Sequence, residues 1–174
     1  MTTLLVTTGP ESSGKTTLAT QLAAALDAPL VAEVARPYLM AKRKADPGFQ
    51  YTQHDLLAIA KLQMAAEKSA LKQADDWLIC DTDLLVIMIW SEVKYGNCEP
   101  ALQALFEQSL ESERHYLLCT PDMPWEPDPL RENPDDRESL FERYRSVLEF
   151  LPVKSLTLSG SAERRFGQVL AHEY

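Results

Sequence analysis

The 174-residue chain has too little positive charge for a nucleic-acid-binding protein. Its 17 Lys and Arg residues are outnumbered by 26 Asp and Glu residues, and the net charge is −9. The longest basic run is the triplet at residues 42–44. Because excess negative charge repels a phosphate backbone, we expect a small-molecule partner and no nucleic acid.

Cysteines and long apolar runs are also scarce. Cys80, Cys98 and Cys119 are odd in number and widely spaced, which argues against a disulfide framework and a zinc site. Two of them lie in apolar runs and are expected to be buried thiols in a reducing compartment. The longest apolar run, residues 84–90, is far too short to span a bilayer, and no basic segment precedes the short apolar stretch at the amino end. We therefore expect a cytoplasmic protein that makes no membrane contact.

The chain does contain a phosphate-binding motif. Residues 9–16 read GPESSGKT, which fits GxxxxGKT, and they lie between an apolar run at residues 4–8 and a helix-like stretch at residues 18–26. The glycines let the backbone wrap around a polyphosphate, so that amide N–H groups and the following helix N-terminus face the anion. Lys15 is expected to reach the β- and γ-phosphates, and the Thr16 hydroxyl to bind Mg²⁺. The alternative is a strand-to-helix turn that only happens to carry Lys-Thr, and the order of strand, loop and helix argues against it.

Strand-like and helix-like segments alternate along the chain, which predicts an α/β fold with a mostly parallel sheet. We expect one domain over residues 1–174, a P-loop kinase with three α/β/α layers and five parallel strands ordered 2-3-1-4-5. The expected strands are residues 4–8, 30–33, 77–80, 115–120 and 153–158. The expected helices are residues 16–26, 34–44, 52–74, 100–111, 135–151 and 161–172, and one more between a Thr82 cap and a Gly96 stop.

Acidic residues follow the predicted third strand. Asp81 has the pattern of a Walker-B carboxylate, which holds Mg²⁺ beside Thr16, although a helix N-cap is the alternative. Asp83 either faces the acceptor substrate or complements the dipole of the following helix. The sequence leaves both readings of Asp83 open.

Glu33 ends the predicted second strand. A carboxylate at this position can face an attacking hydroxyl across the phosphate loop. There it would accept the hydroxyl proton as a general base, or orient sugar hydroxyls. Arg36 follows three residues later, so the two could instead form a pair on the first helical turn.

A proline-rich, acidic segment begins at residue 121, and we expect it to form an irregular lid over about residues 121–137. An arginine delivered onto a transferring phosphoryl group accelerates transfer by a factor of about 10³ to 10⁵. Arg131 and Arg137 are the candidates, acting jointly. The alternative is a solvated loop whose charges pair with each other. Trp125 could stack on a flat substrate ring, whereas Trp90 is expected in the core.

Four motifs in this order resemble the ribosylnicotinamide kinase domain of bacterial NadR-type proteins, an AAA-like P-loop family. They are GPESSGKTTL from residue 9, EVARPYL from residue 33, CDTD from residue 80, and PDMPW from residue 121 with DPLR from residue 128. The resemblance implies ATP- and Mg²⁺-dependent phosphorylation of the 5′-hydroxyl of nicotinamide riboside, giving nicotinamide mononucleotide for NAD synthesis.

The resemblance also implies a set of site residues. Asp81 would serve Mg²⁺, Glu33, Arg36 and Asp83 would surround the ribose and the phosphate acceptor, and Trp125 with Asp128 would meet the nicotinamide. The cationic pyridinium of that nucleoside suits an aromatic face and nearby carboxylates. ATP would be bound by nine consecutive residues: Gly9, Pro10, Glu11, Ser12, Ser13, Gly14, Lys15, Thr16 and Thr17.

The chain departs from that family at Val34, where an aromatic residue is usual, and at Pro129, where glycine is usual. It has no HxGH-like pair, so we do not expect it to make the dinucleotide itself. The remaining alternatives are a kinase of another nucleoside or small metabolite, and a nucleotide-sensing module that transfers no phosphate. The absence of NKxD makes a GTPase a poor alternative.

Overall fold

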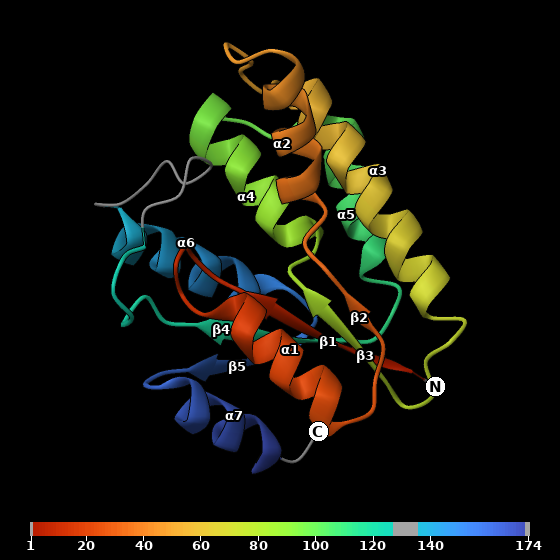
Figure 1. Ribbon diagram of the computed structural model, residues 1–174, viewed down its shortest axis with the longest axis vertical. Coiled ribbons are helices and arrows are strands. Elements are labelled where there is room, and N and C mark those ends of the chain that lie inside the picture. The colour runs from red at the N-terminus through yellow and green to blue at the C-terminus, as the bar shows by residue number, and fades with distance from the viewer. Residues whose placement is uncertain (1, 127–135, 173–174) are drawn as a thin grey trace.

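The computed structural model describes residues 2–126 and 136–172. Within these residues strands and helices alternate as the sequence predicts (Figure 1). In chain order the elements are β1 (Thr3–Thr8), α1 (Lys15–Ala25), β2 (Leu30–Val31), α2 (Ala35–Ala45), α3 (Gln53–Ala70), β3 (Trp77–Asp81), α4 (Leu84–Tyr95), α5 (Pro100–Ser109), β4 (Arg114–Cys119), α6 (Arg137–Phe150), β5 (Lys154–Leu158) and α7 (Ala162–Leu170).

The sheet has five parallel strands in the order β2-β3-β1-β4-β5, which confirms the predicted order. Central strand β1 pairs with β3, where Thr7 lies opposite Asp81, and with β4, where Thr8 lies opposite Leu118. The carboxyl ends of these three strands therefore meet at one edge of the sheet. In an open parallel sheet this edge is where ligands bind.

Helices cover both faces of the sheet, which gives the predicted three layers. Leu5 of β1 packs in a core with Leu18 and Leu22 of α1 and Val169 of α7. The residues before and after it in β1 point to the other face, where they join the larger core formed with α2 to α6. Figure 1 shows α1 and α7 together on one side of the strands. Burial on both faces explains why the middle of β1 is the continuous apolar run Leu4, Leu5 and Val6.

Two glycines make the turn after β1 possible. Gly9 has φ 127°, and a Cβ there would lie 2.7 Å from the Cys119 carbonyl oxygen of β4. Gly14 has φ 79°, and a Cβ there would lie 2.7 Å from the Met123 sulfur. Both positions have a left-handed backbone, and at Gly9 any side chain would also collide with the backbone of β4. The loop between β1 and α1 can therefore fold tightly against the segment that follows β4.

The helix caps are local and were mostly predictable. Thr52 caps α3 and forms a reciprocal capping box with Asp55, as expected. The expected Thr82 cap of α4 is wrong by one residue. Asp83 is the cap and accepts a hydrogen bond from the Leu85 N–H at 3.0 Å, while Thr82 has φ 68° and forms the turn before it. Gly96 ends α4 in the left-handed conformation, as expected.

Strand β2 is shorter than expected. It pairs only with β3 and only over Leu30 and Val31, so Glu33 lies in the turn that leads into α2 rather than on the strand itself. No helix in residues 2–126 and 136–172 has the length and apolar character needed to cross a bilayer.

Candidate active site

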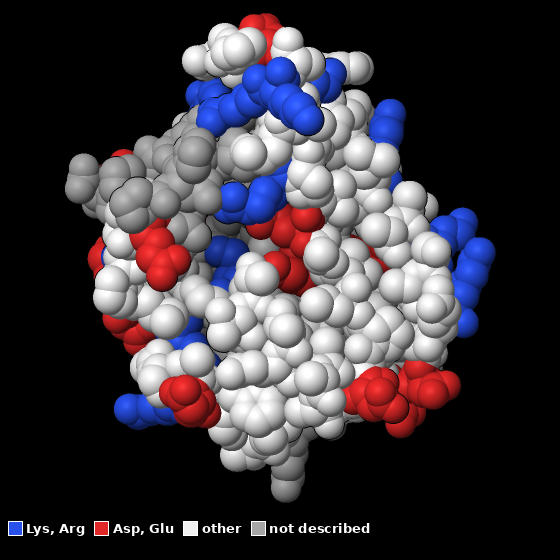
Figure 2. All heavy atoms as spheres, in the orientation of Figure 1, with Lys and Arg blue, Asp and Glu red and all other residues white. Residues whose placement is uncertain are grey.

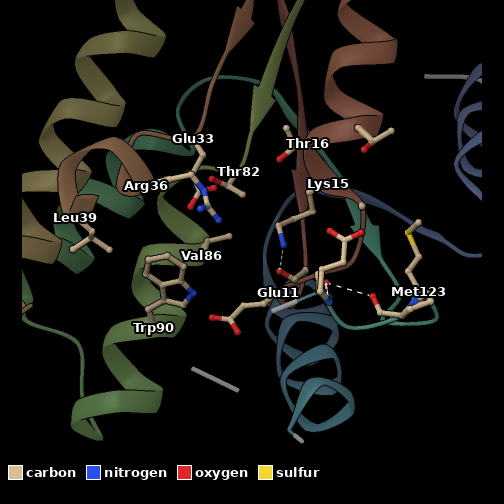
Figure 3. Close-up of a pocket in the computed structure, with 16 residues that line it drawn as sticks. Glu11, Lys15, Thr16, Glu33, Arg36, Leu39, Thr82, Val86, Trp90 and Met123 are labelled. Carbon is tan, nitrogen blue, oxygen red and sulfur yellow. Dashed lines mark hydrogen bonds between the residues drawn. The ribbon is translucent and has the colours of Figure 1, made fainter. Parts of the chain in front are cut away.

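A cavity of about 350 Å³ opens at the carboxyl edge of the sheet. The loop between β1 and α1 forms one wall. Glu33 and Arg36 lie on the opposite wall with α4, and Met123 lies on the side of the phosphate loop (Figure 3). Figure 2 shows a hollow in this face of the molecule in which acidic and basic side chains lie next to each other. The cavity thus combines the phosphate-loop residues with candidate residues from other elements.

The Lys15 ammonium lies against the phosphate loop. Its Nζ donates hydrogen bonds to the Gly9 carbonyl at 3.0 Å and to the Pro10 carbonyl at 2.5 Å. Burial lowers the pKa of Lys15 below its usual value, and the nearby carboxylates of Glu33 and Asp81 oppose that shift. The loop therefore holds a cation that has lost much of its hydration, which strengthens its attraction for a polyphosphate.

Thr16 and Asp81 join the phosphate loop to β3. The Thr16 hydroxyl donates to the Asp81 carboxylate at 2.7 Å, and Asp81 is almost fully buried. The described residues contain no group of three or more His, Cys, Asp or Glu side chains that could hold a metal by themselves. One hydroxyl and one carboxylate nevertheless fit Mg²⁺, which takes one or two protein oxygens and completes its shell with waters and phosphates. Thr16 and Asp81 are the residues that would hold it.

Glu33 and Arg36 face the cavity from the start of α2. Both residues line it and both are half-buried. Figure 3 shows them close together, across the cavity from Lys15. The structure thus brings Lys15, Thr16, Glu33 and Arg36 to one cavity, although most of α1 and the edge strand β2 lie between Lys15 and Arg36 in the sequence.

The expectation that Asp83 faces an acceptor is corrected by its surroundings. Only 1% of Asp83 is exposed, and its carboxylate accepts hydrogen bonds from Arg114 at 3.1 Å and from the Tyr116 hydroxyl at 2.7 Å. It does not line the cavity. The side chain extends into the core because a buried arginine on β4 supplies the opposite charge there.

Only some of the residues expected in the lid are described by the structure. Asp128 and Arg131 lie outside the described residues. Arg137 is the first residue of α6, and its Nη1 donates to the Ser12 carbonyl at 3.2 Å and to the Met123 carbonyl at 2.9 Å. Its guanidinium lies 5.7 Å from the centre of the Trp125 ring. Arg137 is thus next to the phosphate loop, whereas Trp125 lies against Arg137 and does not line the cavity.

Trp90 is a site residue that sequence reasoning missed. It packs against the larger core, as expected, but it is only partly buried and also lines the cavity with Val86 and Thr82. Val86 and Trp90 are four positions apart and therefore share one face of α4, and Thr82 lies in the turn before this helix. The signal was present in the spacing, since the stripe begins directly after Asp81. It was hidden by the run of apolar residues around it.

Arg165 of α7 also supports the site, and it has no local signal. It is 1% exposed, and its guanidinium donates to the Ser13 carbonyl of the phosphate loop, to the Gly160 carbonyl at 2.9 Å and to the Thr120 carbonyl at 2.9 Å. It also forms an ion pair with Asp122. Its partners lie up to 152 positions away in the sequence, so no spacing rule indicates them.

A protein-family model described as an AAA domain matches residues 4–165. The chain belongs to this AAA domain family. By sequence alone, no curated protein matches it. The cavity, with its phosphate loop and the hydrogen bond from Thr16 to Asp81, therefore belongs to an AAA domain.

Solved structures share the fold of this AAA domain at low sequence identity. NadR in complex with NR has a TM-score of 0.78 and 21% identity over 97% of this chain and 50% of the NadR chain. NadR with NAD and AMP-PNP has a TM-score of 0.67 and 19% identity over 97% and 48% of the two chains. Deoxyadenosine kinase from M. mycoides has a TM-score of 0.62 and 13% identity over 96% of both chains. The fold expected from the NadR resemblance is confirmed, and the chain spans about half the length of these NadR chains.

Proposed function

We propose that this AAA domain is a ribosylnicotinamide kinase, which transfers the terminal phosphoryl group of ATP to the 5′-hydroxyl of nicotinamide riboside. The product would be nicotinamide mononucleotide, and the reaction would be a step of NAD salvage in the cytoplasm. One observation carries the proposal: Lys15 and the Thr16–Asp81 pair lie on one side of a cavity whose other side carries Glu33 and Arg36. A phosphoryl donor and an acceptor hydroxyl need such facing walls.

The phosphate-loop side is suited to the donor. The loop amides and the N-terminus of α1 would bind the triphosphate, and Lys15 would exchange its carbonyl partners for phosphate oxygens. Thr16 and Asp81 would hold Mg²⁺, which supplies positive charge to the phosphate oxygens when it is bound. Arg137 adds a cation at Ser12, on the same loop.

The opposite side is suited to the acceptor. Glu33 would take the proton of the 5′-hydroxyl as the hydroxyl oxygen forms a bond to the γ-phosphorus. The bond between that phosphorus and the bridging oxygen breaks, and ADP leaves with the electron pair. Arg36 would offset negative charge on the transferred group. With these roles, the residues on the two walls of the cavity would act together in one in-line transfer.

A second acceptor class is favoured by one comparison. Deoxyadenosine kinase shares this fold over nearly its entire length, whereas NadR does so over half. A kinase of another nucleoside would use the same two walls and differ only in the pocket for the base. An ATP-sensing module without transfer would have no use for a carboxylate opposite the phosphate loop.

Release of ADP in the presence of a panel of nucleosides tests the function. We expect release that depends on nicotinamide riboside and on Mg²⁺, with nicotinamide mononucleotide identified by mass spectrometry. Release driven by another nucleoside would keep the kinase and change its acceptor. Release that no acceptor changes would eliminate the kinase and leave the sensing module.

A further inference from the structure

Helix α2 carries the acceptor side of the cavity but is weakly packed. Glu33 lies in the turn before it, and Arg36 and Leu39 line the cavity from the helix itself. Only Ala35 and Leu39 of its eleven residues are buried. Figure 1 shows α2 away from the strands, next to α3. Two buried apolar side chains give little resistance to a shift of the helix, so the position of the acceptor side depends on further contacts.

Tyr38 connects α2 to the start of α3. Its hydroxyl donates a hydrogen bond to Asp55 Oδ1 at 2.9 Å. Arg36 and Tyr38 are two positions apart and therefore point to different sides of the helix, the first to the cavity and the second to α3. The Tyr38 N–H also donates to the Val34 carbonyl, in the turn that carries Glu33. Tyr38 is thus linked by its side chain to α3 and by its backbone to the start of the acceptor side.

Asp55 is a firm anchor for this contact. It is 7% exposed and belongs to the first turn of α3, a helix of eighteen residues. Its second carboxylate oxygen accepts from the Thr52 N–H at 2.9 Å and from the Thr52 hydroxyl at 2.8 Å. Burial alone would raise the pKa of Asp55, but the hydrogen bonds from Thr52 and Tyr38 lower it below its usual value. The carboxylate therefore stays charged, and a hydrogen bond to a charged group is stronger than one between neutral groups.

The Tyr38 ring is also held in its orientation. The Lys42 ammonium, one turn further along α2, lies 5.5 Å from the centre of this ring and 5.9 Å from the centre of the Phe49 ring. A cation over an aromatic face is attracted to it. Both rings also pack against the larger core. These contacts restrict the rotamers of Tyr38 and keep its hydroxyl at Asp55.

We propose that Tyr38 is a positioning residue, which holds α2 against α3 through Asp55 and thereby keeps Glu33 and Arg36 facing the phosphate loop. This role rests on the proposed function, in which Glu33 and Arg36 act on the acceptor. Tyr38 itself does not line the cavity. Misplacement of a reacting group by about 1 Å can lower a rate about 100-fold, so a contact outside the cavity can control transfer. The donor side belongs to α1 and β3 and should not depend on Tyr38.

The test removes the tyrosine hydroxyl and follows the acceptor and donor sides separately. For Tyr38→Phe we expect kcat of acceptor phosphorylation to fall about tenfold, the factor that corresponds to one hydrogen bond to a charged group. The KM of ATP should change by less than about twofold, because the phosphate loop keeps its own contacts. Hydrogen exchange followed by mass spectrometry should show faster exchange in residues 33–42 and unchanged exchange in α1.

Two further variants separate positioning from a general loss of stability. Tyr95→Phe removes a comparable hydroxyl, which donates to the Tyr51 carbonyl at 2.6 Å, and should leave kcat and the exchange of residues 33–42 unchanged. Asp55→Ala removes the acceptor of the Tyr38 hydrogen bond and should lower kcat at least as much as Tyr38→Phe. Adding Tyr38→Phe to Asp55→Ala should lower kcat by less than about twofold more, because the pair acts through one contact.

The outcomes distinguish the positioning role from the proposed function. Unchanged kcat in Tyr38→Phe, an equal loss in Tyr95→Phe, or independent effects of Tyr38→Phe and Asp55→Ala would overturn the positioning role while the kinase stands. A parent chain that transfers phosphate to no acceptor would overturn the kinase, and hydrogen exchange would then decide about Tyr38. Faster exchange of residues 33–42 in Tyr38→Phe would support its hold on α2, and unchanged exchange would overturn it.

Discussion

Lys15 is the residue on which the donor site depends most. It is the ammonium held by the loop carbonyls of Gly9 and Pro10, with burial lowering its pKa. A preorganised cation of this kind needs no reorganisation when charge develops on the phosphates. Its partners on the loop also explain why it stays in place before a nucleotide arrives.

We predict that Lys15→Ala lowers kcat by at least about 100-fold, because removing one preorganised donor from a developing charge costs a factor of about 10² to 10³. Steady-state ADP release measures the effect, and circular dichroism shows whether the fold is intact. Lys61→Ala, on the exposed face of α3, is the control and should turn over normally. Normal turnover in Lys15→Ala as well would mean that Lys15 does not meet the phosphates.

Kinetic measurements can show whether Glu33 acts as the general base or binds the ribose hydroxyls. We predict that Glu33→Gln lowers kcat by a factor of about 10² to 10⁴, because the amide cannot accept the hydroxyl proton. The KM of the acceptor should change little. A change confined to KM would reassign Glu33 to binding of the ribose hydroxyls.

Among the elements, α7 has a role that its position at the edge of the fold does not suggest. Through Arg165 it contacts the phosphate loop at Ser13, the end of β4 at Thr120 and the segment after β4 at Asp122. Burial alone would raise the pKa of Asp122, but the Gly160 N–H and Arg165 lower it, so this carboxylate stays ionised beside the guanidinium. The helix thereby holds three separate segments in one arrangement.

We predict that Arg165→Met lowers the free energy of unfolding by about 1 to 3 kcal/mol, because it leaves the carbonyl groups of Ser13, Gly160 and Thr120 without their donor. The KM for ATP should rise as the loop loses its support at Ser13. Denaturant unfolding and initial rates measure the two effects. Arg164→Met removes an exposed neighbour and should change neither, and equal effects of both variants would contradict the role given to Arg165.

At the scale of the whole molecule, a buried cluster of charged side chains links β4 to α3 and to the start of α4. Arg114 of β4 donates to Asp83 at 3.1 Å and to Glu67 of α3 at 2.8 Å, and the Tyr116 hydroxyl donates to Asp83. Gln63 donates to Glu67 and to the Thr82 carbonyl, so the cluster also supports the turn that carries Asp81. One guanidinium here balances two carboxylates, which leaves one negative charge in excess.

The excess charge makes stability depend on pH. Burial raises the pKa of Glu67 above its usual 4.5, Asp83 adds to that effect, and Arg114 opposes it. The folded chain therefore holds this proton more tightly than the unfolded chain does. Its stabilising effect is complete below pH 4.5 and is lost as the pH rises through the raised value.

We predict that Glu67→Gln, which cannot titrate, gains stability relative to the parent chain as the pH rises above 4.5. The gain is about 1.4 kcal/mol for each unit by which folding raises the pKa. Denaturant unfolding at a series of pH values measures it, with Glu107→Gln as the exposed control. A stability difference that does not vary with pH would show that Glu67 does not titrate in the folded chain.

Much of the architecture could be predicted because it rests on local patterns. The order of strands and helices, the cap at Thr52 and the stop at Gly96 follow from periodicity and from single residues with special backbone preferences. The phosphate loop and Asp81 could be placed because each follows a strand directly. The ends of the strands were harder to predict. The length of β2, for example, depends on how many of its residues pair with β3.

The sequence by itself determined that a polyphosphate loop lies between the first strand and the first helix, because that signal is contained in eight consecutive residues. Only the tertiary structure decided that Asp83 turns into the core and that Arg165 holds the loop. Each of these depends on a group from a distant segment, the Arg114 side chain for Asp83 and the Ser13 backbone carbonyl for Arg165. Charge pairing and burial between such segments arise only when the sheet assembles, so no local pattern specifies them.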